Sequence, residues 1–234
     1  MPATGTVAES HGSIAPVWHT VIVLFGLVGL ALAVARSASL PFVGSYGKNA
    51  AYVWIILFEW VIVGFVYVGV SRWGMSLRDL VGGQWTRPIA ILRDAAISLV
   101  FLVIIFVVSQ ALGNLLEAEP NEAVRNLIPR SSTQVFLFLA LTLTAGFCEE
   151  VIYRGYLQRQ FSALTQSVAG GIVLQALTFG AGDTYQGWRF VLIISAIGTM
   201  FGVLAHRCRS LRPGMLAHFL QDGIGGLLAR KLLT

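Results

Sequence analysis

Charged residues are scarce in this chain: Asp, Glu, Lys and Arg make up 12% of its 234 residues, and only two of them are lysines. A soluble domain carries about 25% charged residues, so this chain has too little polar surface to cover a water-soluble globule. Hydrophobic residues make up 56% and gather in long runs, which is typical of membrane helices rather than of a soluble core. The composition therefore predicts an all-α, polytopic membrane protein.

Other features are also missing. The two cysteines, Cys148 and Cys208, are too few for a disulfide framework, and no Lys or Arg precedes Val17, which argues against a cleaved signal peptide. The chain contains neither an HExxH zinc motif nor a GxSxG nucleophile motif. Its 14 arginines flank the hydrophobic runs instead of gathering on one face, so nucleic acid is not expected as a partner.

The sequence contains seven hydrophobic segments, whose lengths we compare with the roughly 20 residues that a helix needs to cross a bilayer. The fifth and seventh are short, as segments beside a polar cavity often are. The predicted segments are Val17–Ala35, Ala50–Val70, Ile89–Ala111, Thr133–Leu157, Val168–Ala181, Trp188–His206 and Gly214–Leu228.

Acidic residues within these segments carry the strongest functional signal. A charge at the bilayer centre costs about 2.5–3.5 kcal/mol, so a chain that keeps several has a use for them. We single out five acids in the hydrophobic segments or at their ends: Glu59, Glu149, Glu150, Asp183 and Asp222. Glu59 stands alone in its segment, and we expect it to pair with an Arg or His elsewhere in the bundle, outside the functional site.

The sequence from Glu149 to Arg154 continues a hydrophobic run and is predicted to be helical. Glu150 and Arg154 are four residues apart, so they share a face and can pair. Glu149 is rotated from Glu150 by about 100° and faces elsewhere. A partly desolvated carboxylate beside a like charge suits a general base that activates water. An ordinary salt bridge at the membrane boundary is the alternative, but it does not require two adjacent acids.

His218 and Asp222 are also four residues apart and share a helix face. Asp222 can accept a hydrogen bond from one imidazole nitrogen, which leaves the other for a metal, a water or an oxyanion. Asp183 ends a hydrophobic run in a glycine-rich break, where a turn residue is the simpler interpretation. These spacings single out Glu149, Glu150, Arg154, His218 and Asp222 as candidate catalytic residues, and Asp183 joins them only through the family resemblance that follows.

In this order, the three pieces resemble the CPBP family of intramembrane proteases, which includes the type II CAAX prenyl endopeptidases. The family pattern is EExxxR, then FxxxH, then HxxxN or HxxxD, and the resemblance covers roughly Phe138 to Leu228. EExxxR is complete from Glu149 to Arg154, and HxxxD is present. The middle motif departs, because Asp183 stands where the family has His. An Asp can accept a hydrogen bond from water or bind a hard metal, but it adds negative charge.

The resemblance implies an intramembrane endopeptidase that hydrolyses a C-terminal or membrane-proximal peptide bond by glutamate-activated water. Glu149 would activate the water with help from Asp183, and His218, oriented by Asp222, would stabilise the oxyanion. The expected partners are membrane lipid and a peptide or protein substrate, with or without a lipid modification. A cofactor is left open: a divalent metal such as zinc has Glu149, Asp183 and His218 as candidate ligands.

The family implies an eight-helix bundle, so we expect about seven to eight helices, with a short one in Ser76–Trp85 or Gly113–Ser132. We divide the chain into an N-terminal tail (1–16), N-terminal membrane helices with an interfacial linker (17–130) and CPBP-like catalytic helices (131–234). The excess of Arg over Lys is typical of a high-GC bacterium, so the expected location is the bacterial cell membrane.

Three alternatives stay open. Asp183 favours a catalytically altered or inactive CPBP-fold protein with an immunity, tethering or regulatory role. Gly180 to Asp183 spells the GxGD of aspartyl intramembrane proteases, but in that family the other Asp lies upstream, whereas Asp222 lies downstream. A transporter with a proton relay would need internal repeats, and the sequence has none.

Overall fold

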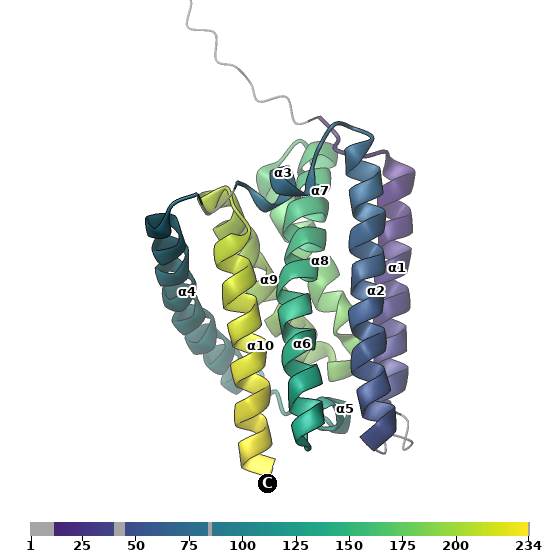
Figure 1. Ribbon diagram of the computed structural model, residues 1–234, viewed down its shortest axis with the longest axis vertical. Coiled ribbons are helices and arrows are strands. Elements are labelled where there is room, and N and C mark those ends of the chain that lie inside the picture. The colour runs from purple at the N-terminus through teal and green to yellow at the C-terminus, as the bar shows by residue number, and fades with distance from the viewer. Residues whose placement is uncertain (1–11, 40–44, 84–85, 234) are drawn as a thin grey trace, which may run out of the picture.

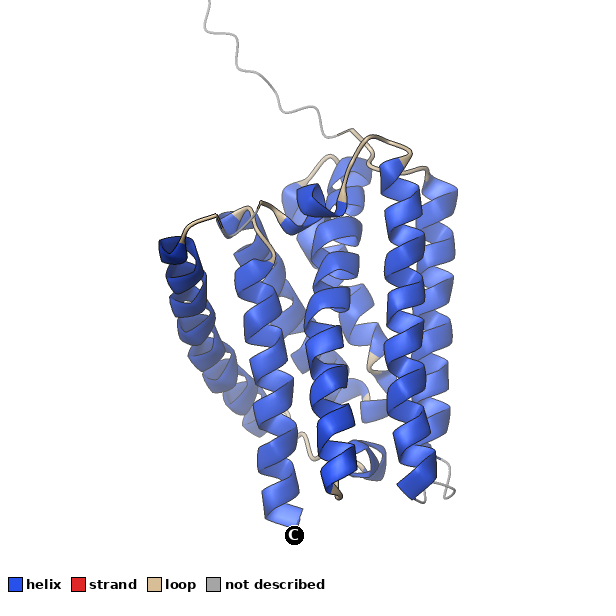
Figure 2. Ribbon diagram, viewed as in Figure 1, coloured by secondary structure: helices blue, strands red, loops and turns tan. Residues whose placement is uncertain are grey.

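The computed structural model describes residues 12–39, 45–83 and 86–233, and all of its regular structure is helical (Figure 2). The all-α prediction is confirmed. Residues 1–11 of the predicted tail and Gln84 and Trp85 of the predicted linker helix lie outside the described residues. The elements are α1 (Val17–Ser39), α2 (Ser45–Ser71), α3 (Leu77–Val81), α4 (Pro88–Leu115), α5 (Glu122–Leu127), α6 (Ser132–Glu149), the π-helix η1 (Glu150–Leu157), α7 (Gln158–Thr165), α8 (Val168–Gly182), the 3-10 turn η2 (Thr184–Gln186), α9 (Trp188–Cys208) and α10 (Arg212–Leu233).

The long helices lie side by side in a bundle, with α6 between α2 and α10 (Figure 1). Helices α1 and α2 form one edge of this view and α4 the other. On the far side of α6, α8 packs against α9, and η1 contacts both of them. The π-helix η1 joins α6 and α7 into one long helix whose middle faces the centre of the bundle.

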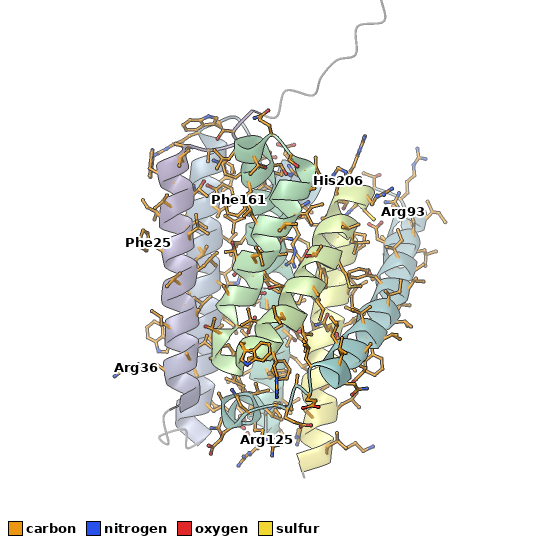
Figure 3. The ribbon with its side chains drawn as sticks, turned by 180° about the vertical axis from the view of Figure 1, so that it is seen from behind. Phe25, Arg36, Arg93, Arg125, Phe161 and His206 are labelled. Atoms are coloured by element: carbon orange, nitrogen blue, oxygen red, sulfur yellow. The ribbon has the colours of Figure 1, made fainter. Side chains whose placement is uncertain are left out.

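Five of the described helices are long and apolar enough to cross a membrane: α1, α2, α4, α9 and the continuous helix Ser132–Thr165. Large apolar side chains such as Phe25 and Phe136 point outward from them, as expected of surfaces in contact with lipid. In Figure 3, Phe25 lies on the side of the bundle, Arg93 and His206 lie toward one end, and Arg36 and Arg125 toward the other. Basic side chains at both ends of an apolar bundle identify a multi-pass integral membrane protein.

A helix is present at each of the seven predicted places, and two of these helices differ from the five long apolar ones. Helix α8 has only 15 residues, which is short for a crossing. Helix α10 has 22 residues, but its polar residues from His218 to Lys231 make it less apolar than those five. Both helices lie beside the polar cavity described below.

The two linkers that were predicted to hide a short helix both contain one. Helix α3 begins with a capping box, in which the Ser76 hydroxyl accepts a hydrogen bond from the Asp79 amide and the Asp79 carboxylate accepts from Ser76. Hydrogen bonds from the Ser76 side chain and backbone hold the pKa of the Asp79 carboxyl below its ordinary value. Helix α3 also holds the central long helix, because Arg159 donates hydrogen bonds to the carbonyls of Asp79 and Leu80.

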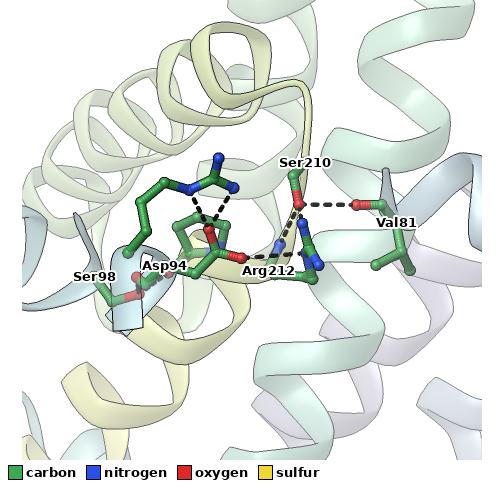
Figure 4. Close-up of polar contacts among 7 residues, drawn as sticks. Val81, Asp94, Ser98, Ser210 and Arg212 are labelled. Carbon is green, nitrogen blue, oxygen red and sulfur yellow. Dashed lines mark hydrogen bonds and ion pairs between the residues drawn. The ribbon is translucent and has the colours of Figure 1, made fainter. Parts of the chain in front are cut away.

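A buried acid that the sequence reasoning overlooked anchors the start of α10. Asp94 on α4 is 1% exposed; it accepts hydrogen bonds from Arg93 and pairs with Arg212 at 3.3 Å (Figure 4). One turn later, the Ser98 hydroxyl donates to the Pro213 carbonyl at 2.8 Å. These contacts fix the first turn of α10 on α4, and therefore the position of His218 along the axis of the bundle.

Glycines allow α10 and α9 to approach their neighbours closely. A Cβ at Gly146 on α6 would lie 2.9 Å from the carbonyl oxygen of Met215 on α10. A Cβ at Gly198 on α9 would lie 3.0 Å from the Phe179 ring of α8. Small residues at such crossings let helix backbones pack together without side chains between them. The first of these crossings brings α10 against the acidic end of α6.

Candidate active site

The predicted pair of Glu150 and Arg154 is present and deeply buried. The two residues are 0% and 1% exposed, and Arg154 Nη1 lies 2.9 Å from Glu150 Oε1. The guanidinium group also lies 4.3 Å from the centre of the Phe179 ring and 5.0 Å from that of Phe201. Arg154 therefore has both an anionic partner and two aromatic faces, which offset the cost of burying its charge.

These residues lie in η1, and π-helical turns are rare and occur frequently at functional sites. Glu149 ends α6 and Glu150 begins η1, so the adjacent acids face different surroundings. The Glu150 side chain is sealed inside the bundle, whereas the Glu149 side chain is 26% exposed. The predicted divergence of the two acids is confirmed.

His218 lies between both acids and Asp222. Its Nε2 is 3.4 Å from Asp222 Oδ2, so the predicted contact between residues four apart is confirmed. The same nitrogen is 3.7 Å from Glu149 Oε2, while Nδ1 is 3.3 Å from Glu150 Oε1. The prediction that Asp222 would leave the second nitrogen free is therefore wrong. The close crossing of α10 and α6 places that nitrogen against Glu150, which sequence spacing alone does not reveal.

A cavity of about 830 Å³ opens in front of these groups. Its wall is mostly apolar and draws on α1, α2, α4, α5, α6, α8, α9 and α10. Four of the six predicted residues line it: Glu149, Asp183, His218 and Asp222. Glu150 and Arg154 lie behind the wall and contact it through His218, Phe179 and Phe201. The six predicted residues thus form one site, assembled from α6, η1, α8 and α10.

Asp183 follows the last residue of α8, as the simpler turn interpretation predicted, and it also lines the cavity. Its Oδ1 accepts a hydrogen bond from Gln186 Nε2 at 2.6 Å within the following 3-10 turn. The turn therefore fixes the carboxylate at the cavity wall. A carboxylate held in this way can accept further hydrogen bonds from water or from a ligand.

The sequence analysis left one acid of the cavity, Glu59, outside the functional site. Glu59 on α2 is 2% exposed and borders the cavity together with Glu149. The structure gives Glu59 no salt bridge to Arg or His among the described residues, contrary to the expected pairing, and its Oε2 has no hydrogen-bond partner. The available signal was its presence in a membrane helix, where an ionisable residue is a functional candidate by default.

The candidate metal ligands do not form a metal centre as they are placed. Within the described ranges, no three His, Cys, Asp or Glu side chains gather closely enough to hold one ion. Two of the three candidates already have partners, since Asp183 is bonded to Gln186 and His218 lies between carboxylates.

One protein-family model matches part of the second half of the chain. Residues 131–224 match the model of the type II CAAX prenyl endopeptidase Rce1-like family. The matched segment begins at the Ser131 cap of α6 and contains all six predicted site residues, so the resemblance inferred from the motifs is confirmed there. Glu59 lies outside the segment that matches the family. No curated protein and no solved structure gives a match.

Proposed function

We propose that this chain is an intramembrane endopeptidase that hydrolyses a C-terminal or membrane-proximal peptide bond with water activated by Glu149. The position of Glu149 carries the proposal. Its carboxylate borders a cavity inside a membrane bundle, 3.7 Å from the imidazole of His218, in a segment that matches an endopeptidase family. A general base needs an accessible carboxylate with room for a water beside it, and the buried Glu150 offers neither.

In the proposed reaction, Glu149 takes a proton from water while the water oxygen attacks the carbonyl carbon of the scissile bond. His218 Nε2 lies at the cavity wall beside Glu149 and Asp222; in the proposal it carries a proton and donates a hydrogen bond to the oxyanion as that charge develops. When the C–N bond breaks, Glu149 returns its proton to the leaving amine. Asp183 accepts a hydrogen bond from the attacking water and orients it.

The buried pair has a positioning role in this proposal. Glu150 contacts His218 Nδ1 and Arg154 at the same time, so it ties the imidazole on α10 to the long central helix. A shift of about 1 Å in a catalytic group can reduce the rate about 100-fold. The pair therefore supports catalysis by holding His218 and Glu149 in register. Membrane lipid surrounds the bundle, and the substrate is a peptide or protein, with or without a lipid modification.

One observation favours a second candidate function. Asp183 lies at the cavity wall where the family motif has His, and a carboxylate cannot donate a hydrogen bond unless it is protonated. A chain that keeps the fold but lacks this donor would suit an immunity, tethering or regulatory role.

The deciding experiment compares four proteins purified in detergent: the parent, Glu149→Gln, Asp183→His and Glu119→Gln. Glu119 is an exposed acid outside the cavity, so its variant controls for the loss of one charge. The assay measures cleavage of a farnesylated C-terminal peptide and of an unmodified peptide that contains a membrane-proximal bond.

The proposal expects the parent and Glu119→Gln to cleave, and Glu149→Gln to lose at least 99% of the rate. Cleavage only by Asp183→His would instead support the non-proteolytic role. Activity that survives in Glu149→Gln would refute the glutamate mechanism.

A further inference from the structure

The cavity has an unusual balance of charge. Its described lining includes four carboxyl side chains and one imidazole, but no Lys or Arg. The carboxyls come from four helices or their ends: Glu59 from α2, Glu149 from α6, Asp183 after α8 and Asp222 from α10. The nearby Arg154 is committed to Glu150. The acids therefore outnumber the bases that face this space, even when His218 is protonated.

Two buried acceptors in the wall also lack a donor. Glu59 Oε2 and Gln221 Oε1 are both buried and without a hydrogen-bond partner, and both residues line the cavity. Leaving such an acceptor unpaired costs about 1–3 kcal/mol, and more for a charged group. A bound proton would neutralise one carboxyl but would not supply donors to both side chains. A ligand with several N–H groups would supply donors, and a positive charge on it would also offset the excess of carboxyls.

A single metal ion fits this arrangement poorly. Metal ions hold their oxygen ligands at about 2.0–2.6 Å, so three ligands must converge on one point. The described acids form no such convergent group. An extended organic cation can instead reach carboxyls that stand apart, and a guanidinium group presents five N–H donors.

We propose that the cavity binds a basic side chain, Arg or Lys, of its peptide ligand among these four carboxyls, with Glu59 as a specificity-determining contact. That the ligand is a peptide rests on the proposed function, whereas that it carries a positive charge rests on the cavity alone. A membrane-proximal segment suits this cavity, because Lys and Arg commonly flank its hydrophobic stretch.

The test uses two peptides, each with one hydrophobic segment, that differ at a single flanking position. One carries Arg there and the other carries citrulline, which has almost the same shape and keeps N–H donors but has no charge. Binding is measured by fluorescence anisotropy in a neutral detergent. The protein is Glu149→Gln, so that cleavage does not consume the peptide. This background still keeps the carboxyls of Glu59, Asp183 and Asp222.

We expect the Arg peptide to bind at least tenfold more tightly than the citrulline peptide. Adding Glu59→Gln should reduce that preference to less than threefold, whereas Glu59→Asp, which keeps the charge, should retain most of it. Adding Glu119→Gln, a matched loss of charge outside the cavity, should change nothing. If Glu59→Gln unfolds, Glu59→Asp and titration with free guanidinium-bearing amines on the parent provide the readout.

Equal affinity for the two peptides would overturn the inference, and so would a preference for the Arg peptide that Glu59→Gln does not reduce. Loss of the preference in millimolar Ca²⁺ or Mg²⁺, with direct binding of the ion, would reassign the site to a metal. The inference and the proposed function can fail separately. Cleavage without charge-selective binding would remove only the inference, and charge-selective binding without cleavage by the parent would remove only the protease.

Discussion

The pair of Glu150 and Arg154 provides a sharp test of the reasoning, because the two groups are 0–1% exposed and 2.9 Å apart. Removing one partner of a buried ion pair leaves an uncompensated charge and typically costs about 3–5 kcal/mol. We therefore expect Glu150→Gln and Arg154→Met each to lower the free energy of unfolding by about this amount. Arg154→Met should lie near the lower end, since His218 Nδ1 is 3.3 Å from Glu150 and can partly compensate.

The double variant is the decisive member of the series. Replacing both partners of a buried pair with uncharged residues of similar volume is often neutral or even stabilising, so the two losses should not add. Unfolding is measured in mixed micelles with increasing SDS, and Glu119→Gln, an exposed acid, controls for charge alone. If the losses of Glu150→Gln and Arg154→Met add within about 0.5 kcal/mol, the two groups do not form the coupled pair that the structure shows.

Two further predictions concern packing. Gly146→Val would place a side chain within about 3 Å of the Met215 carbonyl and push α10 away from α6. Cleavage should therefore fall by about 100-fold, while the helix content measured by circular dichroism stays unchanged. Gly29→Ala, whose added Cβ contacts no other atom, should change neither quantity. Tyr156→Phe removes a hydroxyl 2.7 Å from His19 Nδ1, so unfolding should become about 1–3 kcal/mol easier while kcat per folded molecule stays the same. A parent-like stability of Tyr156→Phe would contradict the contact.

The sequence predicted the parts of the site that depend on local geometry. Residues four apart on a helix share a face, so the pairing of Glu150 with Arg154 and of His218 with Asp222 followed from spacing alone. The different environments of Glu149 and Glu150 followed from helical rotation. These relations hold within one helix and need no knowledge of how the helices pack.

Relations between helices could not be predicted in this way. His218 reaches Glu150 only because α10 crosses α6 at Gly146, and Glu59 reaches the cavity only because α2 packs on the other side of α6. A lone acid in a membrane helix indicates that some partner or function exists, but not where it lies. The packing of α10 is a related case, since this helix is less apolar than the five long ones and lies against α4, α6 and α9.

Asp183 connects the two proposals and shows where they differ. Gln186 holds its carboxylate at the cavity wall, so the residue is fixed as an acceptor beside the other acids. As an acceptor it can orient water for Glu149, and it also adds to the negative charge that would attract a basic side chain. Catalysis requires the water, the base and the scissile bond to be positioned together, whereas attraction of a cation requires only the negative charge. The recognition of a basic segment would therefore survive in a chain whose proteolysis has been lost. In such a chain, Asp183→His would restore proteolysis and weaken the attraction of the basic segment.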